Sequence, residues 1–202
     1  MNDATRGRVL VAGIGNLFLG DDGFGVEAVR ALSARPLPGH VEVVDFGVRG
    51  VHLAYQLLDG YETLVLVDAT ARGGAPGTLY LIEAGPAADG TAGGTAGAVE
   101  PGAAVLDGHH MSPDTVLALL GTLCAGTGTA PPRRTLVVGC EPACVEEGIG
   151  LSPAVAAAVP GAVRMVLDLL DPDAVPAARL DVEPTAPAAV VAGGRPDPRS
   201  DP

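Results

Sequence analysis

The sequence predicts a single three-layer α/β/α domain, with helices on both faces of a mostly parallel, twisted sheet of about five strands. Two observations predict this fold class. Short apolar runs alternate along the chain with longer segments that have the spacing of amphipathic helices, which is the pattern of β-α-β units. The runs at 8–15 and 62–70 are apolar almost throughout, as expected of parallel strands buried on both faces.

The first half of the chain shows the alternation most clearly. The first apolar run ends in glycine, and the helical pattern after it starts with two acids and stops at Pro36. Because strands joined through a helix run parallel, this half predicts the parallel part of the sheet. Its predicted elements are, in order, a strand at 8–15, a helix at 21–36, a strand at 40–47, a helix at 49–60 and a strand at 62–70.

The second half adds two strands and two helices. The segment 76–83 follows the third strand after a tight turn, so we expect an antiparallel edge strand there. A helix at 112–124, a strand at 133–142 and a closing helix at 152–170 complete the domain. Ser152 is expected to cap that last helix, and Pro160 is expected to kink or divide it.

Two segments do not fit the alternation. Residues 84–106 are rich in glycine, alanine and proline, and we expect a flexible loop there. Residues 173–202 are rich in proline, alanine and charge, which is typical of a disordered tail. The predicted organisation is therefore one α/β domain over 8–172 that contains the loop, followed by the tail.

Composition excludes several classes of function. The formal net charge is −12 and the chain contains no lysine, so we expect no nucleic-acid partner, no Schiff-base lysine and no P-loop lysine. No apolar leader and no run of membrane-spanning length is evident, and three cysteines make no disulfide framework. We therefore expect a cytoplasmic protein without a membrane partner, and a monomer.

The stretch GIGNLFLGDDGFG, residues 13–25, combines a glycine turn with two carboxylates. A dinucleotide-binding turn would need a third glycine where Phe18 stands, and Asp21 and Asp22 would repel a pyrophosphate. Helix capping by the two acids is the simplest structural explanation. We expect Asn16 to hold the turn through hydrogen bonds to the backbone.

Other acids follow other predicted strands, which makes capping alone an incomplete explanation. Asp45, Asp68 and Glu141 come at or near the ends of the strands at 40–47, 62–70 and 133–142. Because ligands of open parallel sheets bind outside the carboxyl ends of the strands, we expect these acids to gather at one rim. Their repulsion must be offset by a cation, by basic groups of a substrate or by raised pKa values.

Two histidines precede the helix predicted at 112–124. His109 and His110 lie on a segment that should return to the same rim. Two carboxylates and one imidazole form a plausible site for a divalent transition metal that retains open coordination positions.

Five sequence blocks together resemble the hydrogenase maturation protease family. They are GIGNLFLGDDGFGVEAVRAL, VDFGVRG, LVLVDAT, a histidine ahead of a helix, and GCEPACVEEGIGLSPAV, and the likeness spans roughly residues 8 to 170 in the expected order. The resemblance implies an endopeptidase, aspartyl-type or metal-dependent, that trims the C-terminal peptide from the large subunit of a nickel–iron hydrogenase. It implies that nickel arrives bound to this substrate, with no metal held permanently by the enzyme.

The resemblance also implies which residues form the site. Asp22, Asp68 and His109 match the family positions that bind nickel, and they are the expected catalytic residues. Asp21 and His110 remain the alternatives at the first and third positions. A rival function is a non-catalytic nickel-sensing chaperone for the same large subunit, and a third is a nucleotide-dependent oxidoreductase. Arg49, after the second strand, either contacts substrate or pairs with a rim acid.

Overall fold

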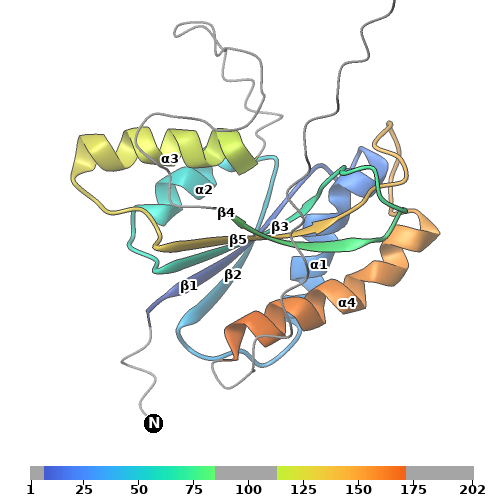
Figure 1. Cartoon of the computed structure of the whole chain (residues 1–202), viewed down its shortest axis with the longest axis horizontal. Coiled ribbons are helices and arrows are strands. Elements are labelled where there is room, and N and C mark those ends of the chain that lie inside the picture. Colours follow the sequence, from blue (N-terminus) through green and yellow to red (C-terminus); the bar gives the residue numbers. More distant parts are fainter. Residues whose placement is uncertain (1–6, 85–112, 172–202) are drawn as a thin grey trace, which may run out of the picture. The chain divides into compact units, whose positions relative to one another are not determined.

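The computed structural model describes residues 7–84 and 113–171, and all elements lie in the compact unit Met1–Asp171. Figure 1 shows a sheet between two helical layers, α2 with α3 on one face and α1 with α4 on the other. The predicted three-layer α/β fold is confirmed. The elements are β1 (Val9–Ile14), η2 (Gly20–Gly23), α1 (Phe24–Ser33), β2 (Val41–Gly47), α2 (Gly50–Leu57), β3 (Thr63–Ala69), β4 (Leu79–Ala84), α3 (Pro113–Thr127), β5 (Arg134–Cys140) and α4 (Pro153–Leu170).

The five strands have the order β2-β1-β3-β5-β4. β1 pairs in parallel with both β2 and β3, β3 pairs in parallel with β5, and β4 runs antiparallel to β5. The expected antiparallel edge strand is thus confirmed. The chain leaves β1 toward one side to form β2 and then crosses to the other side to form β3. This reversal puts a topological switch point at the carboxyl ends of β1 and β3, where ligands of such sheets bind.

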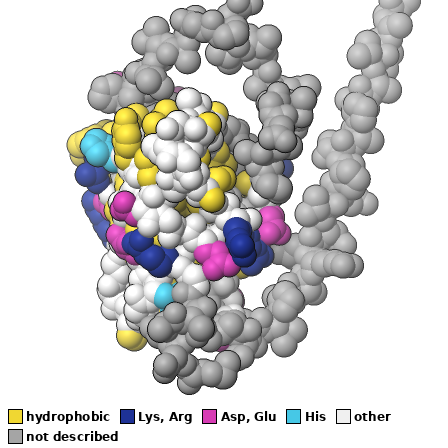
Figure 2. Space-filling model, turned by 90° about the vertical axis from the view of Figure 1, so that its left-hand side faces the viewer, with side chains coloured by type: hydrophobic (Ala, Val, Ile, Leu, Met, Phe, Trp, Pro, Cys, Tyr) yellow, Lys and Arg dark blue, Asp and Glu magenta, His cyan; other side chains and the backbone are white. Residues whose placement is uncertain are grey.

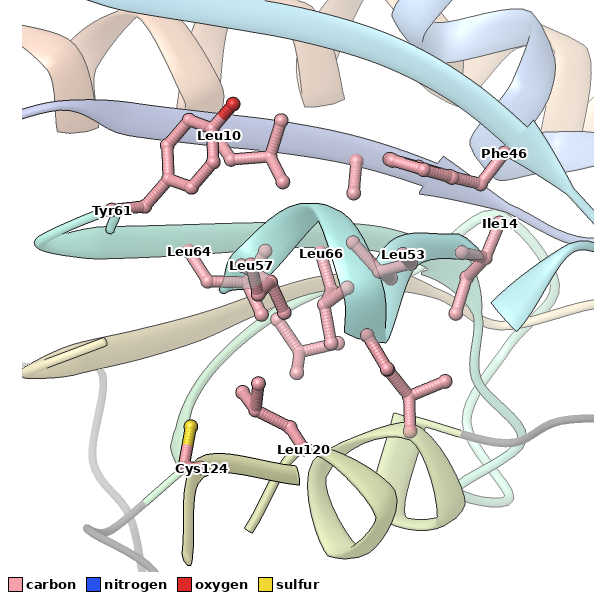
Figure 3. Packing of buried hydrophobic residues seen from close by; sticks show 14 residues of the cluster. Leu10, Ile14, Phe46, Leu53, Leu57, Tyr61, Leu64, Leu66, Leu120 and Cys124 are labelled. Carbon is pink, nitrogen blue, oxygen red and sulfur yellow. The ribbon is translucent and has the colours of Figure 1, made fainter. Parts of the chain in front are cut away.

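Alternating side chains of the central strands fill the core on both faces of the sheet. Leu10, Leu64 and Leu66 face the layer of α2 and α3, as Figure 3 shows from close by. Their neighbours Val11 and Val65 face α1 and α4. Both sets are buried, which explains why β1 and β3 have continuous apolar sequences instead of alternating ones.

Two local expectations need correction. The acids Asp21 and Asp22 do not open the α-helix, because they lie in the 3₁₀ turn η2, and α1 begins at Phe24. The closing helix also continues through Pro160 as one element, so proline does not divide it. Proline removes one backbone donor, but Ala162, Val163 and Val166 beyond it pack into the core and hold the helix together.

α4 also corrects the expectation about membrane-spanning length. Its 18 residues are long and apolar enough to cross a membrane by length and composition alone. Four of them, Val155, Ala162, Val163 and Val166, are buried in the core cluster beside α1, so the fold itself accounts for the apolar character of this face. The loop predicted at 84–106 starts one residue too early, because Ala84 is the last residue of β4. The rest of that loop, His109, His110 and the expected tail at 173–202 lie outside the described residues.

Candidate functional site

The glycine turn after β1 packs closely against the start of α1 and the end of β3, beneath the two acids of the site. Gly15 has φ +126°, and a Cβ there would lie 1.9 Å from the carbonyl oxygen of Asp22. A Cβ on Gly25 would lie 2.1 Å from the carbonyl oxygen of Val67 and 2.3 Å from that of Ile14. Glycine therefore lets η2 and the first turn of α1 approach the ends of β1 and β3 more closely than any other residue would.

Asp22 is held in place by the turn that precedes it. The backbone N–H of Asn16 donates a hydrogen bond of 2.6 Å to Oδ2 of Asp22. The side chain of Asn16 accepts a bond of 3.0 Å from the N–H of Phe18, which confirms the expectation that Asn16 stabilises the turn. The carboxylate of Asp22 thus occupies a donor that a dinucleotide pyrophosphate would need, and this argues against the nucleotide alternative.

Asp68 is the penultimate residue of β3 and lies opposite Gly139 in the β3–β5 register. Burial raises the pKa of Asp68 to about 7, and the negative charge of Asp22 contributes to the rise. The structure therefore brings these two predicted site residues within electrostatic reach of each other. A carboxyl group with such a pKa is characteristic of a functional site rather than of a surface acid.

Asp21 has a different environment from its neighbour. Its side chain is 1% exposed and accepts backbone N–H bonds from Ala143 (2.8 Å), Cys144 (3.1 Å) and Ser152 (2.6 Å). Burial acts to raise the pKa of Asp21, but these hydrogen bonds outweigh it and the pKa lies below its ordinary value. Asp21 fastens the loop after β5 to η2, so its oxygens are engaged and Asp22 is the available acid.

Glu141, directly after β5, is also a structural anchor. Its buried carboxylate accepts N–H bonds from Arg72 (2.8 Å) and Gly73 (3.0 Å) and an O–H bond from Tyr80 (2.8 Å). These hydrogen bonds, above all the one from the backbone N–H of Arg72, hold the pKa of Glu141 below its ordinary value. The expectation that this acid needs a cation, a basic substrate or a raised pKa is wrong, because backbone N–H groups and a phenol supply the compensation.

The negative charge of Asp45, at the end of β2, is compensated by a neighbouring arginine. Asp45 forms an ion pair with Arg30 of α1, with 3.3 Å between Nη2 and Oδ2. Arg49 donates hydrogen bonds to the backbone carbonyls of Asp45 (2.6 Å) and Phe46 (3.0 Å). Arg49 therefore secures the turn into α2 instead of pairing with a rim carboxylate.

The third predicted ligand lies outside the described part of the chain. His109 and its alternative His110 both precede residue 113, where α3 begins. Within 7–84 and 113–171, no group of three histidine, cysteine, aspartate or glutamate side chains is placed to hold a metal ion. Asp22 and Asp68 are thus two carboxylates that could contribute to a cation site and would need further ligands from elsewhere.

Sequence reasoning did not single out the apolar residues that border the acids. Phe18, Val145 and Ile149 are exposed in the loops that follow β1 and β5. The sequence did contain a sign of them, because large apolar side chains stand among glycines and acids just beyond the ends of β1 and β5. No core position is predicted there, so these side chains are candidates for contact with another molecule.

Known proteins similar to this chain are hydrogenase maturation proteins. A family model described as hydrogenase maturation protease matches residues 26–89. The chain is 33% identical over 200 residues to hydrogenase expression/formation protein HoxM of Azotobacter vinelandii, covering 95% of this chain and 89% of that protein. It is 33% identical over 167 residues to hydrogenase 2 maturation protease of Escherichia coli, covering 81% of this chain and 90% of that protein.

Solved structures give the same result. The fold is similar to that of hydrogenase maturating endopeptidase HybD from Escherichia coli, with a TM-score of 0.59 and 32% identity over 81% of this chain and 91% of that chain. It is also similar to hydrogenase 2 maturation peptidase from a Thaumarchaeota archaeon, with a TM-score of 0.56 and 29% identity over 81% and 97% of the two chains. The similarity covers most of the chain in both sequence and fold.

Proposed function

Because the chain belongs to the hydrogenase maturation protease family, we propose that it is an endopeptidase that removes the C-terminal peptide of a nickel–iron hydrogenase large-subunit precursor after nickel insertion. The relative from Escherichia coli is named a hydrogenase 2 maturation protease, and the similar solved structure is named a hydrogenase maturating endopeptidase. These names support the reaction class. The nickel-dependent recognition is our own proposal.

The observation that carries this proposal is the pairing of Asp22 with Asp68. Two carboxyl groups are held near one another at the switch point of the sheet, and burial with mutual repulsion raises the pKa of Asp68 to about 7. A divalent cation brought to the pair would neutralise both charges and displace the proton from Asp68. The site is therefore suited to a cation that arrives with a partner.

In our proposal the cation is the nickel of the precursor. Asp22, Asp68 and His109 bind it, since carboxylate and imidazole groups are suitable ligands for this metal. Binding holds the adjacent C-terminal segment of the substrate at the rim. Nickel either polarises the scissile carbonyl or a water, or acts as a docking point only. A precursor without nickel lacks this contact, so cleavage follows nickel insertion.

A direct test is the intact mass of a nickel-loaded large-subunit precursor incubated with the chain. We expect loss of the C-terminal peptide with the wild type and with Glu83→Gln, an exposed acid on β4 that serves as the matched control. We expect no loss with His109→Ala, whereas His110→Ala should retain cleavage. If the precursor binds and keeps its full mass, the chain is the non-catalytic chaperone of the alternative hypothesis.

A further inference from the structure

Two loops at the carboxyl end of the sheet are joined to each other by backbone hydrogen bonds. We call residues 15–20 and 141–152 the paired loops. The N–H of Gly20 donates to the carbonyl of Gly148 (3.0 Å), and the N–H of Gly148 donates to the carbonyl of Phe18 (2.9 Å). Leu19 and Gly148 form an isolated parallel bridge. The two loops are therefore held together through their backbones. The carboxylate of Asp21 adds to this by accepting the N–H groups of Ala143, Cys144 and Ser152.

The paired loops present large apolar side chains to solvent. Phe18 is 69% exposed, Val145 52% and Ile149 85%. These are three of the five large apolar residues that are exposed in the described part of the chain. Side chains that remain in water add almost nothing to the stability of the fold. If a partner covered them, the removal of their apolar surface from water would contribute to the free energy of binding.

The charge beside this apolar surface indicates what kind of partner fits it. Glu146 and Glu147 lie between Val145 and Ile149, are exposed, and form no ion pair with any residue of 7–84 or 113–171. A second copy of this chain would bring the same acids toward each other in a symmetric contact and be repelled. A partner surface with apolar side chains bordered by lysine or arginine would be complementary on both counts.

We propose that Phe18, Val145 and Ile149 form the docking surface for the precursor protein, through an apolar patch of the precursor bordered by basic side chains. The inference rests on the proposed function and adds a second contact to it. Asp22 lies in η2, four residues after Phe18, and its carboxylate accepts the N–H of Asn16 in the first paired loop. A precursor that places its nickel between Asp22 and Asp68 therefore comes close to the paired loops. The acids then recognise the nickel, and the apolar surface supplies affinity for the protein that carries it.

The test is the binding of nickel-loaded precursor to the full chain, measured by titration calorimetry, with cleavage kinetics in parallel. We expect Phe18→Ser combined with Ile149→Ser to weaken binding and raise KM at least about tenfold while kcat stays within about twofold, because the change removes uniform binding only. Tyr55→Ser is the matched control, since Tyr55 is 57% exposed on α2, and we expect no change. Glu146→Gln with Glu147→Gln should weaken binding and reduce its dependence on salt.

Unchanged binding of the Phe18→Ser/Ile149→Ser variant would overturn the docking surface even if the wild type cleaves. If the wild type binds without cleaving and this variant loses binding, the docking surface stands and the proposed reaction fails. Sedimentation of the wild type and the variant covers a further possibility. A wild-type dimer that the two substitutions dissociate would show that the surface joins copies of the chain, which contradicts the proposal. Tenfold tighter precursor binding after deletion of 172–202 would likewise assign the surface to the chain's own tail.

Discussion

Glu42 at the amino end of the sheet and the pair Asp22 and Asp68 at the carboxyl end differ in how their negative charge is compensated. At the amino end, Glu42 receives hydrogen bonds from Tyr61 (2.5 Å), Gln56 (2.7 Å) and Arg8 (3.4 Å), and the guanidinium of Arg8 lies 4.2 Å from the centre of the Tyr61 ring. Figure 2 faces this end, where basic and acidic side chains lie next to one another. At the carboxyl end, Asp22 and Asp68 are kept within reach of each other, and like charge helps to raise the pKa of Asp68.

This difference supports our proposal that the precursor's nickel binds at the carboxyl end of the sheet. An acid that serves the fold is neutralised by groups of the same chain, as Glu42 is. An acid pair that serves binding keeps part of its charge uncompensated until a cation arrives. Asp21 shows that this distinction applies to single residues, because it adjoins Asp22 and yet its carboxylate accepts three backbone N–H groups of the same chain.

The largest effect should come from removing one charge of the acid pair. Asp68→Asn retains the shape of the side chain but loses the ionised oxygen that would bind nickel. We expect cleavage of nickel-loaded precursor to fall by at least about 100-fold, in line with or beyond the loss seen for groups around metal ligands. The rate of peptide release, followed by mass spectrometry, provides the measurement. Full cleavage by folded Asp68→Asn would exclude this residue from the site.

The same substitution should make the protein more stable at neutral pH. Because the folded pKa of Asp68 is raised from 3.8 to about 7, its contribution to stability is complete below pH 4 and is lost as pH rises through about 7. Asp68→Asn removes this pH-dependent penalty, so urea unfolding should give a gain on the order of a few kcal/mol at pH 8 and little at pH 4. A loss of stability at pH 8 would mean that ionised Asp68 is compensated within the fold.

Asp21→Asn should affect the fold most among the rim acids. The amide oxygen can accept the N–H groups of Ala143 and Cys144, but the –NH2 group cannot accept the N–H of Ser152. This leaves a backbone donor without its partner and replaces two charge-assisted bonds with neutral ones, so we expect a loss of about 2–4 kcal/mol in the free energy of unfolding. Since the folded pKa of Asp21 is lowered, its contribution is present above pH 4 and disappears as pH falls through the folded value. The deficit of the variant should therefore shrink in acid, as urea unfolding at several pH values would measure. Glu27→Gln, on an exposed pair, is the control.

A pair of glycine substitutions separates close packing from backbone strain. Gly15 and Gly73 both have positive φ, but a Cβ on Gly15 would lie 1.9 Å from the Asp22 carbonyl whereas nothing lies within 4 Å of one on Gly73. Gly73→Ala should cost about 1–2 kcal/mol from strain alone. Gly15→Ala should cost at least about 1 kcal/mol more and also reduce cleavage, because Asp22 must move. Equal losses of stability for the two variants would show that the turn is not tightly packed.

The smallest effect should come from an exposed ion pair at the amino end. Arg134 and Glu83 lie 2.9 Å apart, with side chains 50% and 61% exposed. Because water screens such pairs, Arg134→Ala should change the free energy of unfolding by less than about 1 kcal/mol and leave cleavage unchanged. A double-mutant cycle with Glu83→Gln isolates the pair. A coupling energy above this range would make the amino end a larger source of stability than its exposure suggests.

Local pattern was sufficient to predict most of the fold. The apolar runs of β1 and β3 and the short turn before β4 predicted the parallel centre and the antiparallel edge of the sheet, since both depend on neighbouring residues. Which of the rim acids are compensated by the fold, and which remain available for binding, could not be predicted from the sequence. Asp21 is compensated by the N–H of Ser152, which lies 131 residues further along the chain, so no local signal separated it from Asp22. Glu141 likewise depends on Arg72 and Gly73 of another loop.

The central claim is that the acid pair recognises nickel carried by the precursor. The most direct test is the cleavage rate of one precursor preparation, nickel-free and nickel-loaded, by the wild type and by Asp68→Asn. The account predicts rapid cleavage of the loaded precursor by the wild type, negligible cleavage of the nickel-free precursor, and slow cleavage of both by Asp68→Asn. Equal cleavage of nickel-free and nickel-loaded precursor by the wild type would contradict it.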